Sequence, residues 1–325
     1  MIIARTPFRI SFAGGGSDLP DFYKKHGGAV VSTSIDKYIH VSLLPHFEKN
    51  TLLLKYTETE KVERPHDLKN HIARTILTHQ KMRGLEIASS GDLPSQTGLG
   101  SSSSFAVSLY HALSAHQNKK VSPEELAKYA CETEIKKLKY PIGKQDQYAA
   151  AYGGLNFIRF EKDGTVSVEP IRISAKKKNE LDENLLLFYT GITRSANDIL
   201  EVQKNNIQKK TSAVGDLKKM VAIAYEMRDA LERDHIKEFG QLLHKGWLLK
   251  RSVASTITNS EINRYYELGL KNGALGGKLL GAGGGGCLLF YCEKKNQKQL
   301  IKALQKLRHI PFSFSDRGSE IIFRQ

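Results

Sequence analysis

Cysteine is scarce in this sequence, and the few that occur form no recognisable pair. Cys131, Cys287 and Cys292 are the only three among 325 residues, and no C-x-x-C spacing is present. A disulfide framework or a structural zinc site needs such pairs, so neither is expected to organise the fold. The usage is typical of a reducing compartment, and redox chemistry is not expected.

Long apolar runs are also missing. No segment approaches the roughly 20 apolar residues that a transmembrane helix requires. Arg5 and Arg9 interrupt the N-terminal stretch where a signal peptide needs an unbroken apolar core. These absences predict a cytoplasmic protein without a membrane partner.

Acidic residues are fewer than basic ones, which gives a formal net charge of +15. Such a charge is compatible with nucleic acid, a membrane surface or anionic small molecules as partners. The lysine pairs are scattered along the chain instead of being concentrated with aromatics, which favours a solvated basic surface and no nucleic-acid partner. A nucleic-acid-binding protein remains the alternative from another functional class.

Two common nucleotide-binding fingerprints are absent. No lysine follows Gly98 and Gly100 as a Walker A motif requires, and Leu279 occupies the place of the Ser or Thr that should follow Lys278. The Rossmann glycine pattern is absent as well.

The composition that remains is that of an ordinary globular protein, and the length favours two domains. Strand and helix patterns alternate through both halves, which predicts an α+β fold. We place the domains at 1–178 and 179–325, because the lysine-rich stretch Ala175–Glu183 has a turn-like, solvated composition. The predicted strands are 1–12, 29–44, 85–91, 154–160, 184–189 and 287–292, with 55–65 a loop or edge strand. The predicted helices are 66–83, 101–113, 123–138, 142–152, 196–210, 216–233, 235–249, 260–272 and 296–307.

One loop has the chemistry of an anion site. Glycines let a backbone approach a ligand closely, and a following helix N-terminus presents unpaired N–H groups. The alternative, an ordinary serine-capped helix, accounts for one serine but not for four beside two glycines. The predicted phosphate-binding residues are Gly98, Leu99, Gly100, Ser101, Ser102, Ser103 and Ser104.

A second glycine-rich stretch, Lys278–Gly286, runs directly into an apolar strand. A flexible linker would be richer in serine, so we expect this loop to pack against another backbone or a ligand.

Three stretches together resemble the motifs of the GHMP kinases. They are RTPFRISFAGGGSD from Arg5, the Gly98–Ser104 loop, and Gly281–Gly286, in the expected order along the whole chain. The resemblance implies an N-terminal domain like ribosomal protein S5, a ferredoxin-like C-terminal domain, and a site between them that uses ATP and Mg²⁺.

A narrower resemblance is to the bacterial D-glycero-D-manno-heptose 7-phosphate kinases, carried by PFRISFAGGGSDLPDFY, GLGSSSS, PIGKQDQYAAAYGGLN and LLLFYTGITRSA. It implies transfer of the ATP γ-phosphate to the anomeric hydroxyl, giving the 1,7-bisphosphate for nucleotide-heptose and surface polysaccharide biosynthesis. Fucokinases share much of the pattern, so a fucokinase- or galactokinase-like enzyme for an unphosphorylated sugar remains open. A homodimer is compatible with the sequence, which does not fix the oligomeric state.

The resemblance assigns catalytic roles to Asp146 and Arg9. Asp146 would accept the proton of the attacking hydroxyl or orient it, and Arg9 would offset charge on the transferring phosphoryl group. A capping aspartate and an edge-strand surface charge are the plainer alternatives.

For Mg²⁺ the resemblance implies Ser102 and Glu134 as ligands, because this cation takes few hard oxygen ligands beside phosphates. Glu132 competes with Glu134 because the spacing to Asp146 differs slightly from the mevalonate kinase pattern.

The remaining site predictions concern the acceptor. By resemblance Asp18 would bind sugar hydroxyls, although turn capping is an alternative. The turn at Thr193 and Arg194 has hydroxyls and a guanidinium that suit a sugar phosphate, with a capped helix start as the alternative. The predicted acceptor-binding residues are Gly14, Gly15, Gly16, Ser17, Asp18, Thr193, Arg194, Gly283 and Gly284.

Overall fold

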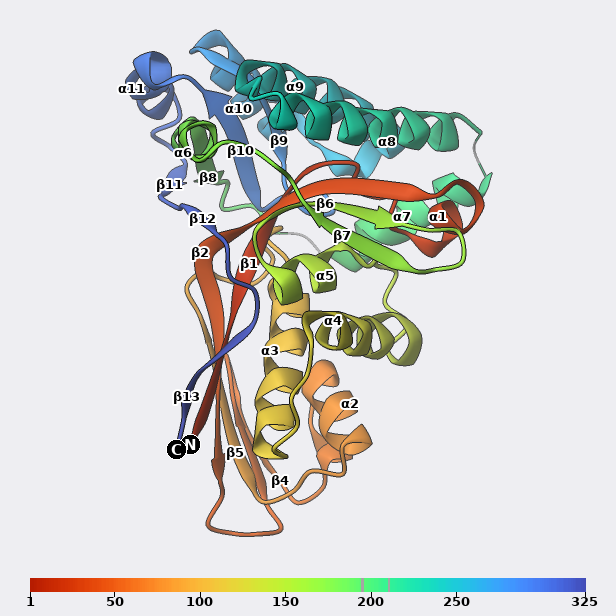
Figure 1. Ribbon diagram of the computed structural model, residues 1–325, viewed down its shortest axis with the longest axis vertical. Helices are drawn as coiled ribbons and strands as arrows, with labels where there is room; N and C mark the ends of the chain where they lie inside the picture. Colours follow the sequence, from red (N-terminus) through yellow and green to blue (C-terminus); the bar gives the residue numbers. More distant parts are fainter. Residues whose placement is uncertain (194–195, 210) are drawn as a thin grey trace.

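The computed structural model describes residues 1–193, 196–209 and 211–325, and two β-sheets organise the chain (Figure 1). The first sheet has nine strands and the second has four. The alternation of strands and helices along the chain confirms the predicted α+β class. The first sheet contains β1 (Ile2–Ala13), β2 (Gly28–Pro45), β3 (Leu52–Lys55), β4 (Thr59–Val62), β5 (Leu85–Gly91), β6 (Leu155–Phe160), β7 (Val166–Pro170), β12 (Phe314–Ser315) and β13 (Glu320–Arg324). The second contains β8 (Leu185–Tyr189), β9 (Ala274–Leu279), β10 (Cys287–Cys292) and β11 (Arg308–Ile310).

The long strand β2 determines the shape of the first sheet. It pairs along most of its length with β1, while its first half also pairs with β6 and its second half with β5. The main path runs β13-β1-β2-β5-β3-β4, antiparallel except between β3 and β5. The strands therefore diverge from the centre of the molecule, where β1 and β2 pass close to the second sheet (Figure 1).

Among the described residues, seven helical segments precede β6 in the sequence and seven follow β7. The first group is α1 (Pro20–His26), η1 (Pro65–Asp67), α2 (His71–His79), α3 (Ser101–His116), α4 (Pro123–Cys131), η2 (Glu132–Lys137) and α5 (Gln145–Tyr152). The second is α6 (Ala175–Glu183), α7 (Ala196–Lys209), α8 (Thr211–Glu232), α9 (Ile236–Val253), η3 (Ser255–Ile257), α10 (Ser260–Lys271) and α11 (Lys294–Ala303).

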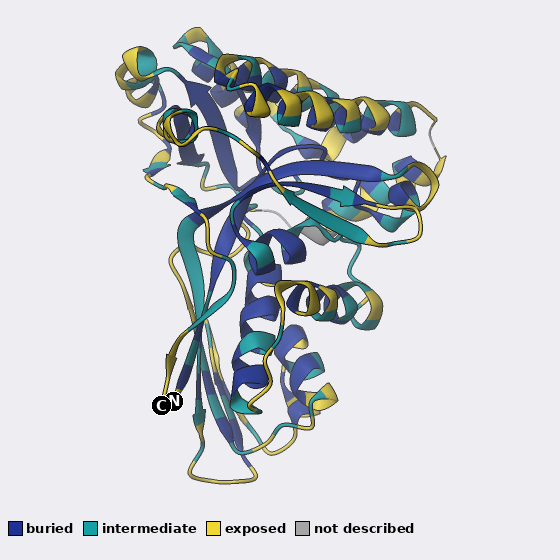
Figure 2. Cartoon of the chain, in the orientation of Figure 1, coloured by how far each residue is buried: buried dark blue, intermediate teal, exposed yellow. Residues whose placement is uncertain are grey.

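Helix α3 forms the centre of the N-terminal half. Most of its residues are buried, and Ala106, Leu109 and Leu113 pack into a core with strands β1, β2 and β5 (Figure 2). Its neighbour α4 begins at a capping box formed by Ser122 and Glu125, in which both reciprocal bonds are present. Burial of α3 fixes the position of its N-terminus, which opens toward the functional site.

Two sequence-based assignments are wrong. Ala175–Glu183 is the helix α6 and not a turn, because Ser174 caps its N-terminus and Leu181 is fully buried. Lys278 and Leu279, the first two residues of the stretch expected to be a loop, instead end the strand β9, in which Gly276 and Gly277 allow the backbone of α9 and the side chain of Phe290 to approach closely.

The ends of the chain meet in the first sheet. Strand β13 pairs with β1 and β12 with β2, so the last residues leave the second sheet and return to the first (Figure 1). The domain boundary between residues 178 and 179 stays a prediction. The C-terminal segment belongs to the second half of the sequence but pairs with strands of the first half.

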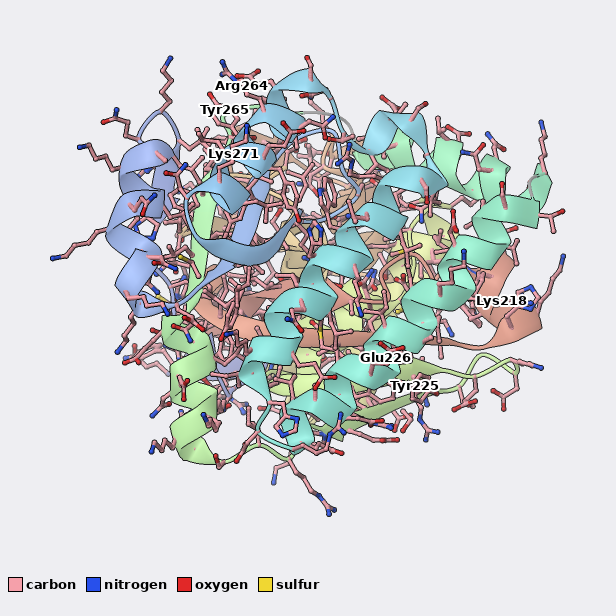
Figure 3. All side chains as sticks on the ribbon, turned by 90° about the horizontal axis from the view of Figure 1, so that it is seen from above. Lys218, Tyr225, Glu226, Arg264, Tyr265 and Lys271 are labelled. Atoms are coloured by element: carbon pink, nitrogen blue, oxygen red, sulfur yellow. The ribbon has the colours of Figure 1, made fainter. Side chains whose placement is uncertain are left out.

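Charged side chains cover the outer surfaces of the helices (Figure 3). Lys218 on α8 and Lys271 on α10 are among the side chains labelled there. Within the described ranges, no helix is both long and apolar enough to cross a membrane.

Candidate active site

A cavity of about 950 Å³ lies between the two halves of the chain. Its walls come from β1, the loop before α3, the N-termini of α3 and α5, helix η2, and the C-terminal α9 and β9 with the loop that follows. Elements that are distant in sequence therefore converge on one space.

The predicted phosphate loop forms one wall. Gly98 and Gly100 have φ angles of +80° and +78°, and Gly100 is the N-cap of α3. This left-handed backbone suits glycine, and it directs the first N–H groups of α3 toward the cavity. The members of the predicted loop that line the cavity are Gly98, Gly100, Ser101, Ser102 and Ser103.

The other two members of the loop have structural contacts. Leu99 is fully buried, and its carbonyl accepts a hydrogen bond of 3.0 Å from the backbone N–H of Arg9. Ser104 is also buried and donates its hydroxyl hydrogen to the carbonyl of Pro7 at 2.9 Å. Both residues attach the loop to β1.

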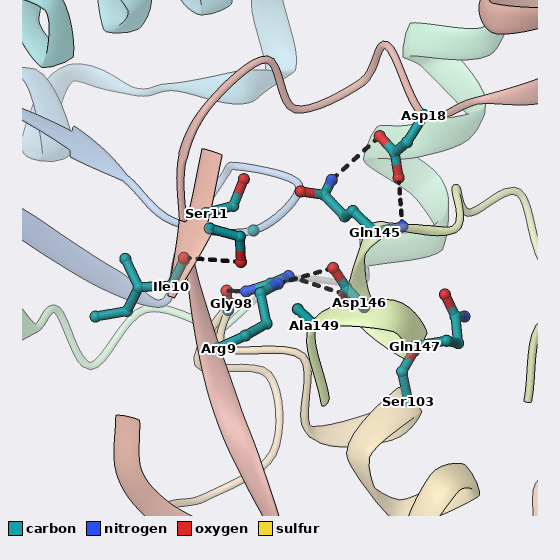
Figure 4. A network of polar contacts seen from close by, with 12 residues as sticks. Arg9, Ile10, Ser11, Asp18, Gly98, Ser103, Gln145, Asp146, Gln147 and Ala149 are labelled. Atoms are coloured by element: carbon teal, nitrogen blue, oxygen red, sulfur yellow. Dashed lines mark hydrogen bonds and ion pairs between the residues drawn. The ribbon is translucent and has the colours of Figure 1, made fainter. Parts of the chain in front are cut away.

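Arg9 and Asp146 form a bidentate ion pair beside this loop (Figure 4). Arg9 Nε and Nη2 each donate to one oxygen of Asp146 at 2.8 Å, and Nη1 donates to the carbonyl of Gly98 at 2.7 Å. The Arg9 side chain is 4% exposed and that of Asp146 is 27% exposed. The carboxylate is therefore held in a fixed orientation while one edge stays accessible.

Glu134 lies behind the phosphate loop on η2, a turn of π-helix. Its carboxylate accepts hydrogen bonds from Ser102 and Ser103 at 2.8 Å and from Gln147 at 2.7 Å. Burial raises the pKa of Glu134, and these donors oppose the shift. The π-helical turn is a local departure of a kind that often accompanies functional sites.

The hydroxyl of Ser102 and the carboxylate of Glu134 supply the hard oxygens that Mg²⁺ prefers, at the edge of the phosphate loop. Glu132 instead pairs with Lys137 at 3.3 Å and does not line the cavity. The geometry thus fits Ser102 and Glu134 as the pair that would hold the ion. Among the described residues no group of three or more His, Cys, Asp or Glu forms a metal cluster.

The first glycine-rich turn forms the opposite wall. Gly15, Gly16 and Asp18 line the cavity. Asp18 accepts hydrogen bonds from Gly16 N at 3.0 Å and from the backbone and side-chain nitrogens of Gln145, both at 3.1 Å (Figure 4). Burial, followed by the nearby charge of Asp146, raises the pKa of Asp18. Asp18 thus joins the turn to the segment that carries Asp146.

Gly14 and Ser17 lie behind this wall. A Cβ on Gly14 would meet the carbonyl of Ala29, and the Ser17 hydroxyl exchanges hydrogen bonds with the backbone of Ala29 at 3.1 Å. They shape the turn and do not reach the cavity.

Four other predicted residues lie away from the cavity or outside the description. Gly283 and Gly284 pack against Ile257, with a 2.8 Å bond from Gly284 N to its carbonyl. Thr193 is exposed and does not line the cavity. Arg194 lies outside the described residues.

Sequence reasoning missed several cavity residues. The Ser11 hydroxyl and Gln145 Oε1 are buried without a hydrogen-bond partner among the described residues, and both lie within 4 Å of the point where a Cβ on Gly15 would be. Both residues lie inside the motifs that resemble the GHMP kinases, Ser11 two residues after Arg9 and Gln145 directly before Asp146. Their closeness to these two residues is the sequence signal that could have identified them. Lys250 and Lys278 also line the cavity, but nothing in the sequence distinguishes Lys250 from the many other lysines.

Comparison with known proteins agrees with this geometry. The GHMP kinases N terminal domain matches residues 68–154, and the GHMP kinases C terminal domain matches residues 227–309. The D-glycero-alpha-D-manno-heptose 7-phosphate kinase of Campylobacter jejuni is 34% identical over 334 residues, covering 98% of this chain and 97% of that protein. The chain therefore belongs to the GHMP kinases, and it is a phosphotransferase with an alcohol group as acceptor.

Solved structures place it among the sugar-kinase-like members of that fold. A putative sugar kinase from Campylobacter jejuni superimposes with a TM-score of 0.78 at 31% identity, covering 98% of this chain and 97% of the other. A D-glycero-D-manno-heptose 1-phosphate kinase from Bacteroides thetaiotaomicron gives 0.81 at 22% identity, with both chains covered completely. The second likeness shows the fold alone, which is the predicted two-domain GHMP fold.

Proposed function

We propose that this kinase transfers the γ-phosphate of ATP to the anomeric hydroxyl of D-glycero-D-manno-heptose 7-phosphate, giving the 1,7-bisphosphate. The observation that carries the proposal is the Arg9–Asp146 pair, which lies between the phosphate loop and the wall formed by Gly15 and Asp18. A hydroxyl bound against that wall faces a nucleotide phosphate at the loop. The identity of the sugar is supported by the heptose kinase relative.

In this reaction Asp146 orients the acceptor hydroxyl and takes its proton as the new oxygen–phosphorus bond forms. Arg9 fixes Asp146 and places positive charge beside Gly98, where the incoming phosphoryl group would lie. Ser102 and Glu134 would hold Mg²⁺, which neutralises phosphate charge when bound. The buried acceptors Ser11 and Gln145 face the space for the sugar.

An acceptor screen tests the substrate. With Mg²⁺ and ATP, we expect phosphorus NMR to show a 1,7-bisphosphate from heptose 7-phosphate, and much slower reaction with free heptose, fucose or galactose. Equal use of free heptose would refute a phosphate requirement, and preference for fucose or galactose would support an enzyme for unphosphorylated sugars. The scarcity of cysteine supports the cytoplasm, where ATP is available, as the place of action.

Asp146→Asn tests the assigned chemistry. We expect kcat to fall by about 10²–10⁴-fold, because the variant keeps the side-chain shape but loses the proton acceptor. Nucleotide affinity, measured by calorimetry, should change little since Asp146 acts on the acceptor. Near-normal turnover would remove Asp146 from the mechanism.

A further inference from the structure

Two buried lysines form a cationic cluster with Arg9 at the C-terminal wall of the cavity. Lys250 comes from α9 and Lys278 from β9, and they are 7% and 5% exposed. Both side chains line the cavity. No ion pair involves either lysine within the described part of the chain, and the nearby Asp146 is already paired with Arg9.

Backbone carbonyls account for only part of their hydrogen bonding. Lys250 Nζ donates to the carbonyls of Leu279 at 3.3 Å and Gly281 at 2.5 Å. Lys278 Nζ donates to those of Ser11 at 2.7 Å and Phe12 at 2.9 Å. An ammonium group has three N–H donors, so each lysine keeps one for a further acceptor.

The positive charges of Lys250 and Lys278 would be stabilised by an anion bound in the cavity. Burial, followed by the charge of Arg9, lowers the pKa of Lys250 to about 7. Burial, followed by the charges of Lys250 and Arg9, also lowers the pKa of Lys278. Buried ammonium groups are costly without a counter-charge, and an oxyanion in the cavity would supply one.

The position of Lys250 indicates which anion it would bind. Its partner Gly281 packs directly against Gly98 of the phosphate loop, because a Cβ on Gly281 would lie 2.6 Å from the Cα of Gly98. The carbonyl of Gly98 is also the acceptor of Arg9 Nη1. Lys250 and Arg9 therefore reach the same end of the phosphate loop, whereas Lys278 reaches the β1 residues on the acceptor side.

We propose that Lys250 donates its free N–H to a non-bridging oxygen of the nucleotide γ-phosphate and holds that group beside Arg9 during transfer. This rests on the proposed kinase reaction. The acceptor oxygen forms its bond to the γ-phosphorus, the bond to the β–γ bridging oxygen breaks with its electron pair leaving on ADP, and the hydroxyl proton goes to Asp146. Lys250 gains or loses no covalent bond and acts through charge on the phosphoryl oxygens.

The test compares binding of the β,γ-imido analogue of ATP with binding of ADP, both with Mg²⁺, to wild type and Lys250→Met. We expect the variant to lose about tenfold or more in affinity for the analogue, as for a lost charged hydrogen bond, and less than about twofold for ADP. Lys245→Met, an exposed lysine on the same helix, is the matched control and should change neither affinity. The measurement needs no acceptor, so it stands whether or not the heptose assignment does.

Several results would overturn the proposal. Equal losses for both nucleotides would mean a structural role, and no loss for either would mean that Lys250 does not touch the nucleotide. A raised KM for the sugar phosphate with an unchanged nucleotide ratio would assign the cation to the acceptor's phosphate instead. If Lys250→Met does not fold, Lys250→Gln retains donors for the two carbonyls and must show the same selective loss.

Discussion

At the scale of single residues, the site depends on side chains that join separate segments. Arg9 donates hydrogen bonds to both Asp146 on α5 and Gly98 in the phosphate loop. Glu134 accepts hydrogen bonds from two serines of α3 and from Gln147 of α5. Each carboxylate is oriented by several donors, so the geometry exists before substrates bind. Such preorganisation reduces the reorganisation required for phosphoryl transfer.

Ser102→Ala tests the proposed magnesium ligand. We expect the Mg²⁺ concentration for half-maximal rate to rise several-fold, because a hydroxyl ligand is lost while Glu134 keeps its other donors. The measurement is a magnesium titration of the initial rate at saturating ATP. Ser104→Ala is the control, since its hydroxyl bonds Pro7 and not Glu134. An unchanged titration in Ser102→Ala would contradict the assignment.

At the scale of elements, the second glycine-rich stretch (Lys278–Gly286) supports the phosphate loop. Gly281 packs against Gly98, and the N–H of Cys287 donates to the carbonyl of Thr97 at 3.0 Å. The loop after β9 thus fixes the phosphate loop from the opposite half of the chain. The prediction that this stretch packs against another backbone is confirmed for Gly281, and its cause is the close approach that only glycine permits.

Gly98→Ala should weaken both stability and activity. A Cβ there would lie 2.6 Å from the carbonyl oxygen of Leu280, and the residue has a left-handed φ of +80°. Gly191→Ala is the control, because its φ is +72° but no atom of the described residues lies within 4 Å of the new Cβ. Both variants carry the left-handed backbone cost of about 1–2 kcal/mol, and only Gly98→Ala adds a collision. Equal losses of Tm in the two variants would contradict the interlocked-loop account.

Helix α6 provides a pH-dependent contact with the C-terminal segment. Burial raises the pKa of Asp182 to about 6, although the N–H of Phe314 donates to it at 3.1 Å. Because the folded-state pKa lies above the ordinary value of 3.8, stability is lost as the pH rises from about 4 to about 6, and the loss is constant at higher pH. Asp182→Asn should therefore raise Tm at pH 8 and have little effect near pH 4. Thermal melts across this range measure it, and a pH-independent effect would exclude the titration.

At the scale of the whole molecule, the two halves are joined by the C-terminal return as well as by the active site. Strand β13 covers the edge of β1, and Arg5 pairs with Glu320 at 2.9 Å. Arg9 lies further along the same strand. The C-terminal segment therefore stabilises the strand that carries a proposed catalytic residue.

Removal of residues 313–325 should lower Tm markedly and promote association through the exposed edge of β1. Thermal melts and sedimentation measure the two effects. Removal of Gln325 alone is the control, since it eliminates only the terminal contacts with Met1. A truncated protein with the oligomeric state and the Tm of the full chain would show that the return strands are dispensable.

The sequence by itself determined the fold class and the family, and it pointed to residues that the structure brings to the cavity, among them Arg9 and Asp146. Local signals sufficed because glycines, serines and caps act within a few residues: α3 begins at the predicted serines, and α4 begins at its capping box. Glu134 was distinguished from Glu132 only by the tertiary structure, since the π-helical turn decides which carboxylate faces Ser102.

Only the tertiary structure revealed Lys250, Lys278 and the unpartnered groups of Ser11 and Gln145. A lysine on a helix has the same local pattern whether it faces solvent or a cavity, and its environment depends on elements far away in sequence. The same reason explains why Gly283 and Gly284 were assigned to the substrate although they pack on Ile257. Local chemistry fixes where a chain can turn or begin a helix, whereas long-range packing decides which side chains share a buried space.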